Sequence, residues 1–575
     1  MSTLNIEKFY KSFPTLSHRR NRFPYEKEIN WNMKLGEITP IAAIRVVPGQ
    51  TYNLDMSTVI KVAPLSITPM DNAVAKFFAF WNPDRNDWSN YKFWFGEKQN
   101  PENPEEEPTY LVPKVTAPAT WTEEVKKIVD GEEVTETVTH TGFAFNSFYD
   151  NIGAVPGVSN YKIDAFLPRT DRHIYNTYFR NQTLENPLEI NNGDEDDDPM
   201  QNMKLRKICK PRDLFTQCLP TQSGTTPVEI PLGSTAPVIG NGIGLGLTDG
   251  TVFGSPSQAD YSRLYLSDDN FGKKVGTGNG SGYAGGTQNL TVGVVTDPAK
   301  SGLIADLTKA LGAPLEGLYQ AVAYNTFQYL TSRGGNRYFE HISNIYGTVN
   351  PDGVLQQPEF LGSLSQMIEF DTVTQTSSTA GESTPLGNRA SNGYMENYGG
   401  IINKSFGEFG WIIIYGVVTH YPKYQQGVTK LMQTDDPLEL FNPIFNLMGD
   451  EAIYRSEIYM QSDSVVNEDG TPVNDEVFGY GKRNSRLLYP VNEIHGEQRS
   501  TYAQSLDAYH FAQEFEEAPT LNKEFDKVTD EGFKRALTVT DETQFICNTL
   551  ITGTQDIEIP LEAIPNINPM LAFQP

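Results

Sequence analysis

Hydrophobic and polar positions alternate along several stretches of the chain. In residues 51–65, TYNLDMSTVIKVAPL, every second residue is apolar (Tyr52, Leu54, Met56), so the apolar side chains share one face. This alternation predicts a strand with one buried face. Residues 73–81, AVAKFFAFW, form a continuous apolar run that ends at Asn82-Pro83 and predicts a strand buried on both faces. Residues 411–422, WIIIYGVVTHYP, are rich in β-branched side chains and predict another buried strand.

A hairpin and a helix are the other local elements with a clear signal. Residues 123–140 contain two β-like runs separated by Asp130-Gly131, and these two residues suit a type I′ turn because both central positions need a positive φ. The pattern predicts an exposed, charged hairpin. Residues 315–335 carry apolar side chains at helical spacing and end in Gly334-Gly335, which predicts a helix.

Two segments lack any regular pattern. Residues 232–300 are rich in Gly, Ser, Thr and Asn, and an irregular segment of this length inside a compact domain is usually functional or disordered. Residues 191–199, NNGDEDDDP, form an acidic run without the glycine and distant glutamate of an EF-hand loop. We expect this run to be a solvated loop.

Composition favours strands joined by loops, because the 575 residues include 28 Tyr and 31 Phe together with 48 Gly and 37 Pro. The formal net charge is −27, so the chain as a whole is a poor ligand for a phosphate backbone. Contact with nucleic acid must therefore be local, or must be supplied by a basic partner. The basic residues of the first 30 positions predict such a contact: Lys8, Lys11, Arg19, Arg20 and Arg22.

No catalytic, metal-binding or cofactor-binding motif was found. The seven histidines form no HExxH, and neither a GxSxG nor a Walker sequence occurs. The glycines of 240–246 and 276–282 do not stand between a strand and a helix, as a dinucleotide site requires. Three cysteines without a CxxC favour a reducing compartment. The longest apolar runs are too short to cross a bilayer. We expect no enzymatic activity, no metal, no cofactor and no membrane insertion.

One long stretch resembles a known family. Residues 332–362, SRGGNRYFEHISNIYGTVNPDGVLQQPEFLG, resemble the major capsid protein of the Microviridae, particularly its gokushovirus branch of small single-stranded DNA bacteriophages. Further segments resemble the same family in the same order: VVPGQTYNLD (46–55), IYNTYFRNQTLEN (174–186), RDLFTQCLPTQSG (212–224) and VFGYGKRNSRLLYP (477–490).

The resemblance implies an all-β fold, an eight-stranded antiparallel viral jelly roll with long inserted loops and a few short helices. In this interpretation residues 1–30 are an internal N-terminal arm, and residues 31–575 are a single capsid domain that carries the hairpin and the Gly-rich insertion. Sixty copies would form a T=1 icosahedral capsid around the DNA genome. The implied partners are minor virion proteins, including a small basic DNA-packaging protein. The chain would be assembled in the bacterial host cytoplasm and reside in the virion.

The resemblance also implies roles for particular segments. The insertion 232–300 would form a protrusion at the threefold axis that meets a host surface receptor. Its polar residues expected to be exposed are Asp268, Asp269, Asn270, Asn279, Ser281 and Tyr283. We further expect acidic loops such as 194–198 to face outward or to lie at hydrated interfaces, and 344–363 to be a loop that contacts a neighbouring subunit.

Two other functions fit the same composition. A β-sandwich carbohydrate-binding adhesin or spike would form discrete oligomers, whereas a capsid subunit forms closed shells. A jelly-roll glycosidase would carry a concave site with perturbed carboxylates.

Overall fold

A computed structural model shows two compact units, one made of residues 1–223 and 332–575 and the other of Gly224–Thr331. The residues that the structure describes are 20–98, 108–129, 132–222, 238–240, 246–248, 265–266, 275–276, 291–293, 303–305, 315–334, 337–348, 356–374, 389–447, 449–467, 469–539 and 543–559.

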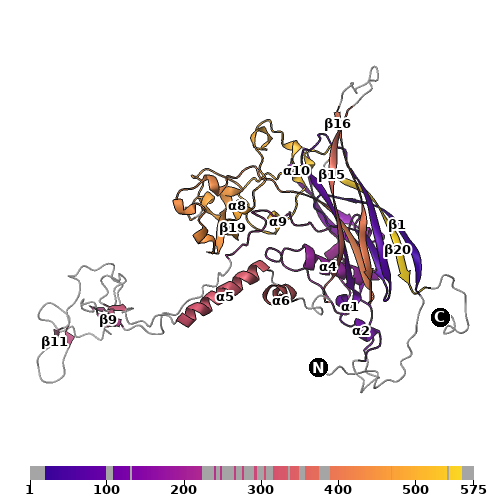
Figure 1. Cartoon of the computed structure of the whole chain (residues 1–575), viewed down its shortest axis with the longest axis horizontal. Coiled ribbons are helices and arrows are strands. Elements are labelled where there is room, and N and C mark those ends of the chain that lie inside the picture. Colours follow the sequence, from indigo (N-terminus) through magenta and orange to yellow (C-terminus); the bar gives the residue numbers. More distant parts are fainter. Residues whose placement is uncertain are drawn as a thin grey trace, which may run out of the picture. The chain divides into compact units, whose positions relative to one another are not determined.

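Eight long antiparallel strands form the framework of the first unit (Figure 1). One sheet has the order β1-β20-β3-β16 and the other β15-β4-β17-β2. The strand β15 joins them, because its first part pairs with β4 and its last residues, Glu369–Thr374, pair with β16. This is the predicted jelly roll. The strands are β1 (Asn21–Met33), β2 (Thr39–Val46), β3 (Thr51–Val62), β4 (Ala73–Pro83), β15 (Glu359–Thr374), β16 (Arg389–Ser405), β17 (Gly410–His420) and β20 (Phe545–Ile557).

The space between the two sheets holds the main hydrophobic core. Strand β3 alternates strictly, so that Leu54, Met56 and Ile60 are fully buried between the sheets. From the opposite sheet, Phe77 of β4 and Ile412 of β17 point into the same core. The prediction of a one-face strand at 51–65 is therefore confirmed, and the strand ends at Val62.

Strands β4 and β17 bury their second face as well, as their unbroken apolar runs predict. Phe80 of β4 and Ile413 of β17 belong to a second core, on the outer face of their sheet. The β4–β15 connection, residues 84–358, supplies the cover. Its elements in the first unit are α1 (Asp84–Asp87), α2 (Tyr91–Trp94), β5 (Lys114–Thr116), β6 (Trp121–Val129), β7 (Glu132–His140), α3 (Phe148–Asn151), β8 (Lys162–Asp164), α4 (Phe166–Ile174), the π-helix η3 (Tyr175–Phe179), the 3₁₀ turn η4 (Pro199–Asn202) and α6 (Tyr338–Tyr346).

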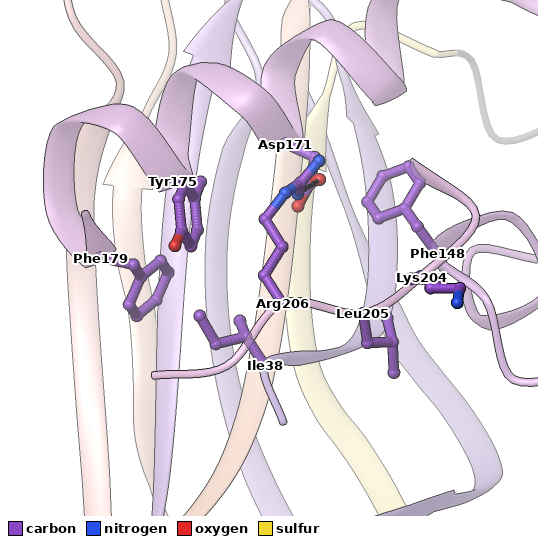
Figure 2. A pocket seen from close by; sticks show the side chains of 8 residues that line it. All are labelled: Ile38, Phe148, Asp171, Tyr175, Phe179, Lys204, Leu205 and Arg206. Carbon is purple, nitrogen blue, oxygen red and sulfur yellow. Dashed lines mark hydrogen bonds and ion pairs between the residues drawn. The ribbon is translucent and has the colours of Figure 1, made fainter. Parts of the chain in front are cut away.

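Helix α4 is attached to the sheet by buried polar contacts that involve Asp171, which Figure 2 shows beside Arg206. Asp171 of α4 pairs with Arg206 and also accepts a hydrogen bond of 2.8 Å from the hydroxyl of Tyr415 on β17. The guanidinium of Arg206 lies 5.3 Å from the centre of the Tyr175 ring. Because all these groups find partners inside the fold, they position the connection on the sheet without leaving a buried charge unpaired.

The acidic run 191–199 is only partly solvated, so the expectation of a solvated loop is wrong at Asp197. Asp197 is 8% exposed and pairs with Arg172 and with Arg169, whose Nη2 lies 2.7 Å from Asp197 Oδ1. Arg169 is itself fully buried and donates to the carbonyls of Gly193 and Glu195. Asp197 is buried in this run because the two arginines of α4 need an anionic partner there.

The β17–β20 connection, residues 421–544, forms a third, smaller core with Phe215, Tyr424 and Ile453. It consists of short elements: η6 (Lys430–Met432), η7 (Pro437–Glu439), η8 (Pro443–Leu447), β18 (Asp450–Tyr454), η9 (Arg455–Glu457), η10 (Val473–Asp475), β19 (Val477–Lys482), α8 (Ser485–Leu488), η11 (Gly496–Gln498), η12 (Asp507–Tyr509), α9 (Lys523–Asp526) and α10 (Glu531–Lys534).

The second unit consists of nested strand pairs followed by a helix, and it is wider than the predicted insertion of 232–300. Its outermost described pair joins β9 to β14, the next β10 to β13, and the innermost β11 to β12. The predicted helix is confirmed as α5. The bounds are β9 (Val238–Gly240), β10 (Gly246–Thr248), β11 (Tyr265–Leu266), β12 (Val275–Gly276), β13 (Thr291–Gly293), β14 (Leu303–Ala305) and α5 (Leu315–Gly334), whose last three residues belong to the first unit.

Two predicted boundaries are wrong. The arm was expected to reach residue 30, but β1 begins at Asn21 and pairs along its length with β20. In β1 apolar residues alternate with polar ones except at Glu26–Glu28, which are all polar, and this interruption made the strand hard to predict. Tyr25, Ile29 and Trp31 nevertheless pack on the main core. The expected loop 344–363 is shorter than predicted, because residues 344–346 end α6 and residues 359–363 begin β15; within it, residues 349–355 lie outside the described residues.

The predicted hairpin is confirmed, with β6 and β7 paired from Trp121↔His140 to Val129↔Glu132.

Candidate functional site

The basic residues predicted to contact DNA are only partly described. Lys8, Lys11 and Arg19 lie outside the described residues. Arg22 stands in β1, and its Nε and Nη2 lie 2.7 and 2.9 Å from the two oxygens of Asp556 on β20. Arg20 lies 3.4 Å from Glu558. The structure therefore brings these two arginines to one end of the β1–β20 pair, where each already has an exposed carboxylate partner.

The six polar residues predicted to meet a receptor all lie outside the described residues. They are Asp268, Asp269, Asn270, Asn279, Ser281 and Tyr283. The nearest described elements are the innermost strands β11 and β12, which pair through Tyr265↔Gly276 and Leu266↔Val275. In the sequence, residues 268–270 lie between these two strands, and residues 279–283 lie between β12 and β13.

A further candidate site, missed from the sequence, lies on the β17–β20 connection. Several large apolar side chains there face solvent, including Ile444, which is 81% exposed, and Met432, which is 78% exposed. Four others are more than half exposed and line a groove of about 470 Å³. We call this set the 431–487 surface, and its members are Leu431, Met432, Leu440, Phe441, Ile444 and Leu487.

The local backbone explains why these side chains point outward. Three 3₁₀ turns follow one another in residues 430–447, and two of them begin at a proline, Pro437 and Pro443. Such short turns use their own side chains as caps: Asn442 Oδ1 accepts from Ile444 N at 3.0 Å. Turns of three to five residues cannot wrap around a core of their own. The side chains of Leu431, Met432 and Ile444, which belong to these turns, consequently remain at the surface.

The floor of the groove is polar but internally satisfied. Arg486 donates to both carboxylate oxygens of Glu457, at 2.7 and 2.6 Å, and also pairs with Glu451. Burial lowers the pKa of Arg486 to about 10, so it remains protonated at neutral pH. The guanidinium of Arg483 lies 5.8 Å from the ring centre of Phe445. These contacts fix the floor and leave the apolar rim as the part available to a partner.

An exposed apolar surface of this kind is typical of an interaction site. Among the described residues no three His, Cys, Asp or Glu side chains are grouped as a metal site would require. No described helix is both long and apolar enough to cross a membrane. The arrangement can bind another apolar surface, and its polar floor is already satisfied by its own partners.

Comparisons with known proteins support one family. The family described as capsid protein (F protein) matches residues 12–141 and 132–566. Capsid protein VP1 of Bdellovibrio phage phiMH2K is 30% identical over 545 residues, which cover 92% of each chain. Capsid protein VP1 of Spiroplasma virus 4 is 27% identical over 93% of this chain and 92% of its own. Capsid protein VP1 of Chlamydia phage 1 is 26% identical over 97% of both.

Proposed function

This chain belongs to the capsid protein (F protein) family and is a phage capsid subunit, and we propose that sixty copies of it form a closed T=1 icosahedral shell around a single-stranded DNA genome. A capsid subunit has a structural role, and we assign it no enzymatic activity. The family match runs through almost the whole jelly roll and both long connections. We further propose that the shell is assembled in the host cytoplasm.

The observation that carries the proposal is the 431–487 surface on a strongly acidic chain. Copies with a net charge of −27 repel one another, so their association needs surfaces that carry apolar area and little charge. The 431–487 surface offers several half-exposed or more exposed apolar side chains around one groove. Burying the exposed part of each side chain against a neighbouring subunit contributes about 1–2 kcal/mol. Repetition around symmetry axes multiplies this gain over the shell.

Enclosing DNA with an acidic chain requires local neutralisation. We propose that Lys8, Lys11 and Arg19 face the genome, and that Arg20 and Arg22 assist by exchanging their carboxylate partners for phosphates. Arg22 is well exposed, which supports its availability. A small basic packaging protein would provide the remaining positive charge. Wild-type DNA content after charge reversal of Arg19, Arg20 and Arg22 together would refute this role of the arm.

Attachment to the host is assigned to the second unit, Gly224–Thr331. A compact unit inserted into the β4–β15 connection can vary without disturbing the eight-stranded framework, which supports the assignment. Asp268, Asp269, Asn270, Asn279, Ser281 and Tyr283 are the proposed receptor contacts. Replacing 240–285 by a short Gly-Ser linker should abolish adsorption while particles still form. Normal adsorption of such particles would place the receptor contact elsewhere.

Negative-stain microscopy of the purified full chain tests the shell itself. Closed particles of uniform size support a capsid subunit. Discrete small oligomers would instead support the carbohydrate-binding adhesin or spike that the composition alone also allows.

A further inference from the structure

A second cleft lies on the first unit, away from the 431–487 surface. It has a volume of about 340 Å³ and is built where the π-helix η3 ends above the outer face of β4. Small-molecule sites usually measure about 300–1,000 Å³. Aromatic and cationic side chains dominate its lining: Phe78, Phe80, Tyr178, Phe179, Phe360, Arg180 and Arg212.

The aromatic wall is organised around Phe80. The ring centre of Tyr178 lies 4.7 Å from that of Phe80, and the ring centres of Phe179 and Phe360 each lie 5.6 Å from it. Consecutive residues of an α-helix point about 100° apart. The π-turn, closed by a 2.9 Å hydrogen bond from Arg180 N to Tyr175 O, lets both Tyr178 and Phe179 reach Phe80. Such turns occur frequently at functional sites.

Two of these rings are unexpectedly open to solvent. Phe80 is buried, but Tyr178 is 44% exposed and Phe360 is 45% exposed. The Tyr178 hydroxyl donates to the carbonyl of Pro358 at 2.7 Å, which holds its ring in place. Phe360 is fixed by its position in β15, opposite Phe80 of β4. The cleft therefore has preformed, half-exposed aromatic faces.

On the cationic side of the cleft, one buried donor atom has no hydrogen-bond partner. Arg180 donates one Nη1 hydrogen bond to the carbonyl of Glu185 at 2.8 Å, but its buried Nε has no hydrogen-bond partner. No carboxylate among the described residues pairs with Arg180. Burial and the nearby Arg337 lower its pKa. Arg212, at the same cleft, is half exposed and pairs with Asp526 at 3.2 Å. An anion at Arg180 would supply a charge-assisted partner.

We propose that this cleft binds one nucleotide of single-stranded DNA, with the base against Tyr178 and Phe360 and the phosphate at Arg180. The proposal rests on the proposed function in one respect: the DNA is the genome that the shell encloses. Stacking on aromatic side chains together with cationic contacts is how proteins bind single strands without sequence preference. An aromatic side chain from a second copy would fill the ring space but leave Arg180 without its anion.

The cleft would give an acidic subunit a local binding site for DNA. Each copy would contribute one base-stacking position and a phosphate contact, independently of the N-terminal arm. With one phosphate neutralised per site, binding should weaken only shallowly with salt, with a logarithmic slope of about −0.7.

The test compares two probes on the purified full chain: a fluorescent hexathymidylate, and an abasic hexamer with the same phosphates but no bases. We expect the hexathymidylate to bind more tightly. Phe360→Ala should weaken its binding by about 5- to 100-fold and leave abasic binding unchanged. Arg180→Gln should weaken the binding of both probes. Phe360→Trp should retain binding, which guards against a mere folding defect.

The matched control is Tyr394→Ala, since Tyr394 is an aromatic residue of strand β16 with a similar exposure of 41%. Equal binding of the two probes, or equal losses in Phe360→Ala and Tyr394→Ala, would overturn the proposal. A side chain of a second copy in the cleft of assembled particles would also overturn it. Sedimentation of the same preparations separates the two claims: particles without base-dependent binding refute the cleft alone, and a chain that never forms particles refutes the shell.

Discussion

Tyr415 and Asp171 are 244 residues apart in the chain and are joined by a hydrogen bond of 2.8 Å between the tyrosine hydroxyl and a carboxylate oxygen. Tyr415 stands on the outer face of β17 and Asp171 on α4, so this contact fastens the β4–β15 connection to the jelly roll. Both side chains are almost completely inaccessible, and burial together with the Asp171 charge raises the pKa of Tyr415 far above its usual value.

Removing the Tyr415 hydroxyl should therefore destabilise the first unit. In Tyr415→Phe the Asp171 carboxylate loses a buried donor, and the free energy of unfolding should fall by about 1–3 kcal/mol. Urea denaturation of the unassembled chain measures this. Tyr398→Phe is the control, because the Tyr398 side chain is 70% exposed, and it should change stability by less than about 0.5 kcal/mol. Equal losses of stability in Tyr415→Phe and Tyr398→Phe would mean that the Tyr415 hydrogen bond does not stabilise the first unit significantly.

The buried pair of Arg169 and Asp197 should matter more than its exposed neighbour. Arg169→Met leaves Asp197 with a single arginine partner in a buried site and should lower the free energy of unfolding by about 3 kcal/mol. Lys162→Met removes the exposed pair with Asp196 at 3.3 Å and should cost at most about 1 kcal/mol. The double variant Arg169→Met/Asp197→Leu should be less destabilised than the sum of its single variants. Additive losses would contradict the pairing.

His173 should make stability depend on pH. Burial lowers its pKa to about 4, whereas the unfolded chain has a pKa of about 6.5. As the pH falls from 6.5 to 4, His173 binds a proton in the unfolded state but stays neutral in the folded state. This group should therefore reduce stability by up to about 1.4 kcal/mol per pH unit in that window. His173→Gln should flatten the curve there, and an unchanged slope would show that His173 does not titrate as described.

Charges placed on the 431–487 surface should block assembly without unfolding the chain. Phe441→Asp and Ile444→Asp put a carboxylate where a neighbouring subunit would bury an apolar group, and particles should disappear from sedimentation profiles. Circular dichroism should remain unchanged, because both positions are exposed in the isolated chain. Val155→Asp, at a position 59% exposed in the β4–β15 connection, is the control. Similar loss of particles in all three variants would remove the special role of this surface.

Much of the framework could be predicted from the sequence, because the order of apolar and polar residues in its strands indicates which faces are buried. The alternation of β3 and the unbroken apolar runs of β4 and β17 correspond to one and two buried faces. Strand β1 escaped notice because Glu26, Lys27 and Glu28 interrupt its alternation at a sheet edge, where polar side chains remain solvated.

The functional surfaces were harder to predict, for physical reasons. Leu440, Phe441 and Ile444 look like core residues in sequence, and only the folded structure shows that they are exposed. Asp197 looked like one more solvated acid, because its partners Arg169 and Arg172 are distant in sequence and share a buried helix face. The cleft depends on a π-turn that places Tyr178 beside Phe80, and no local pattern in the sequence indicates such a turn.

The most direct test of the shell is the mass of the assembled particle. Sixty copies of the 64.2 kDa chain give about 3.9 MDa for a DNA-free particle. Mass photometry of purified empty particles should show a single peak at that mass. A chain that remains a monomer at every concentration, or that stops at oligomers of a few copies, would contradict the account.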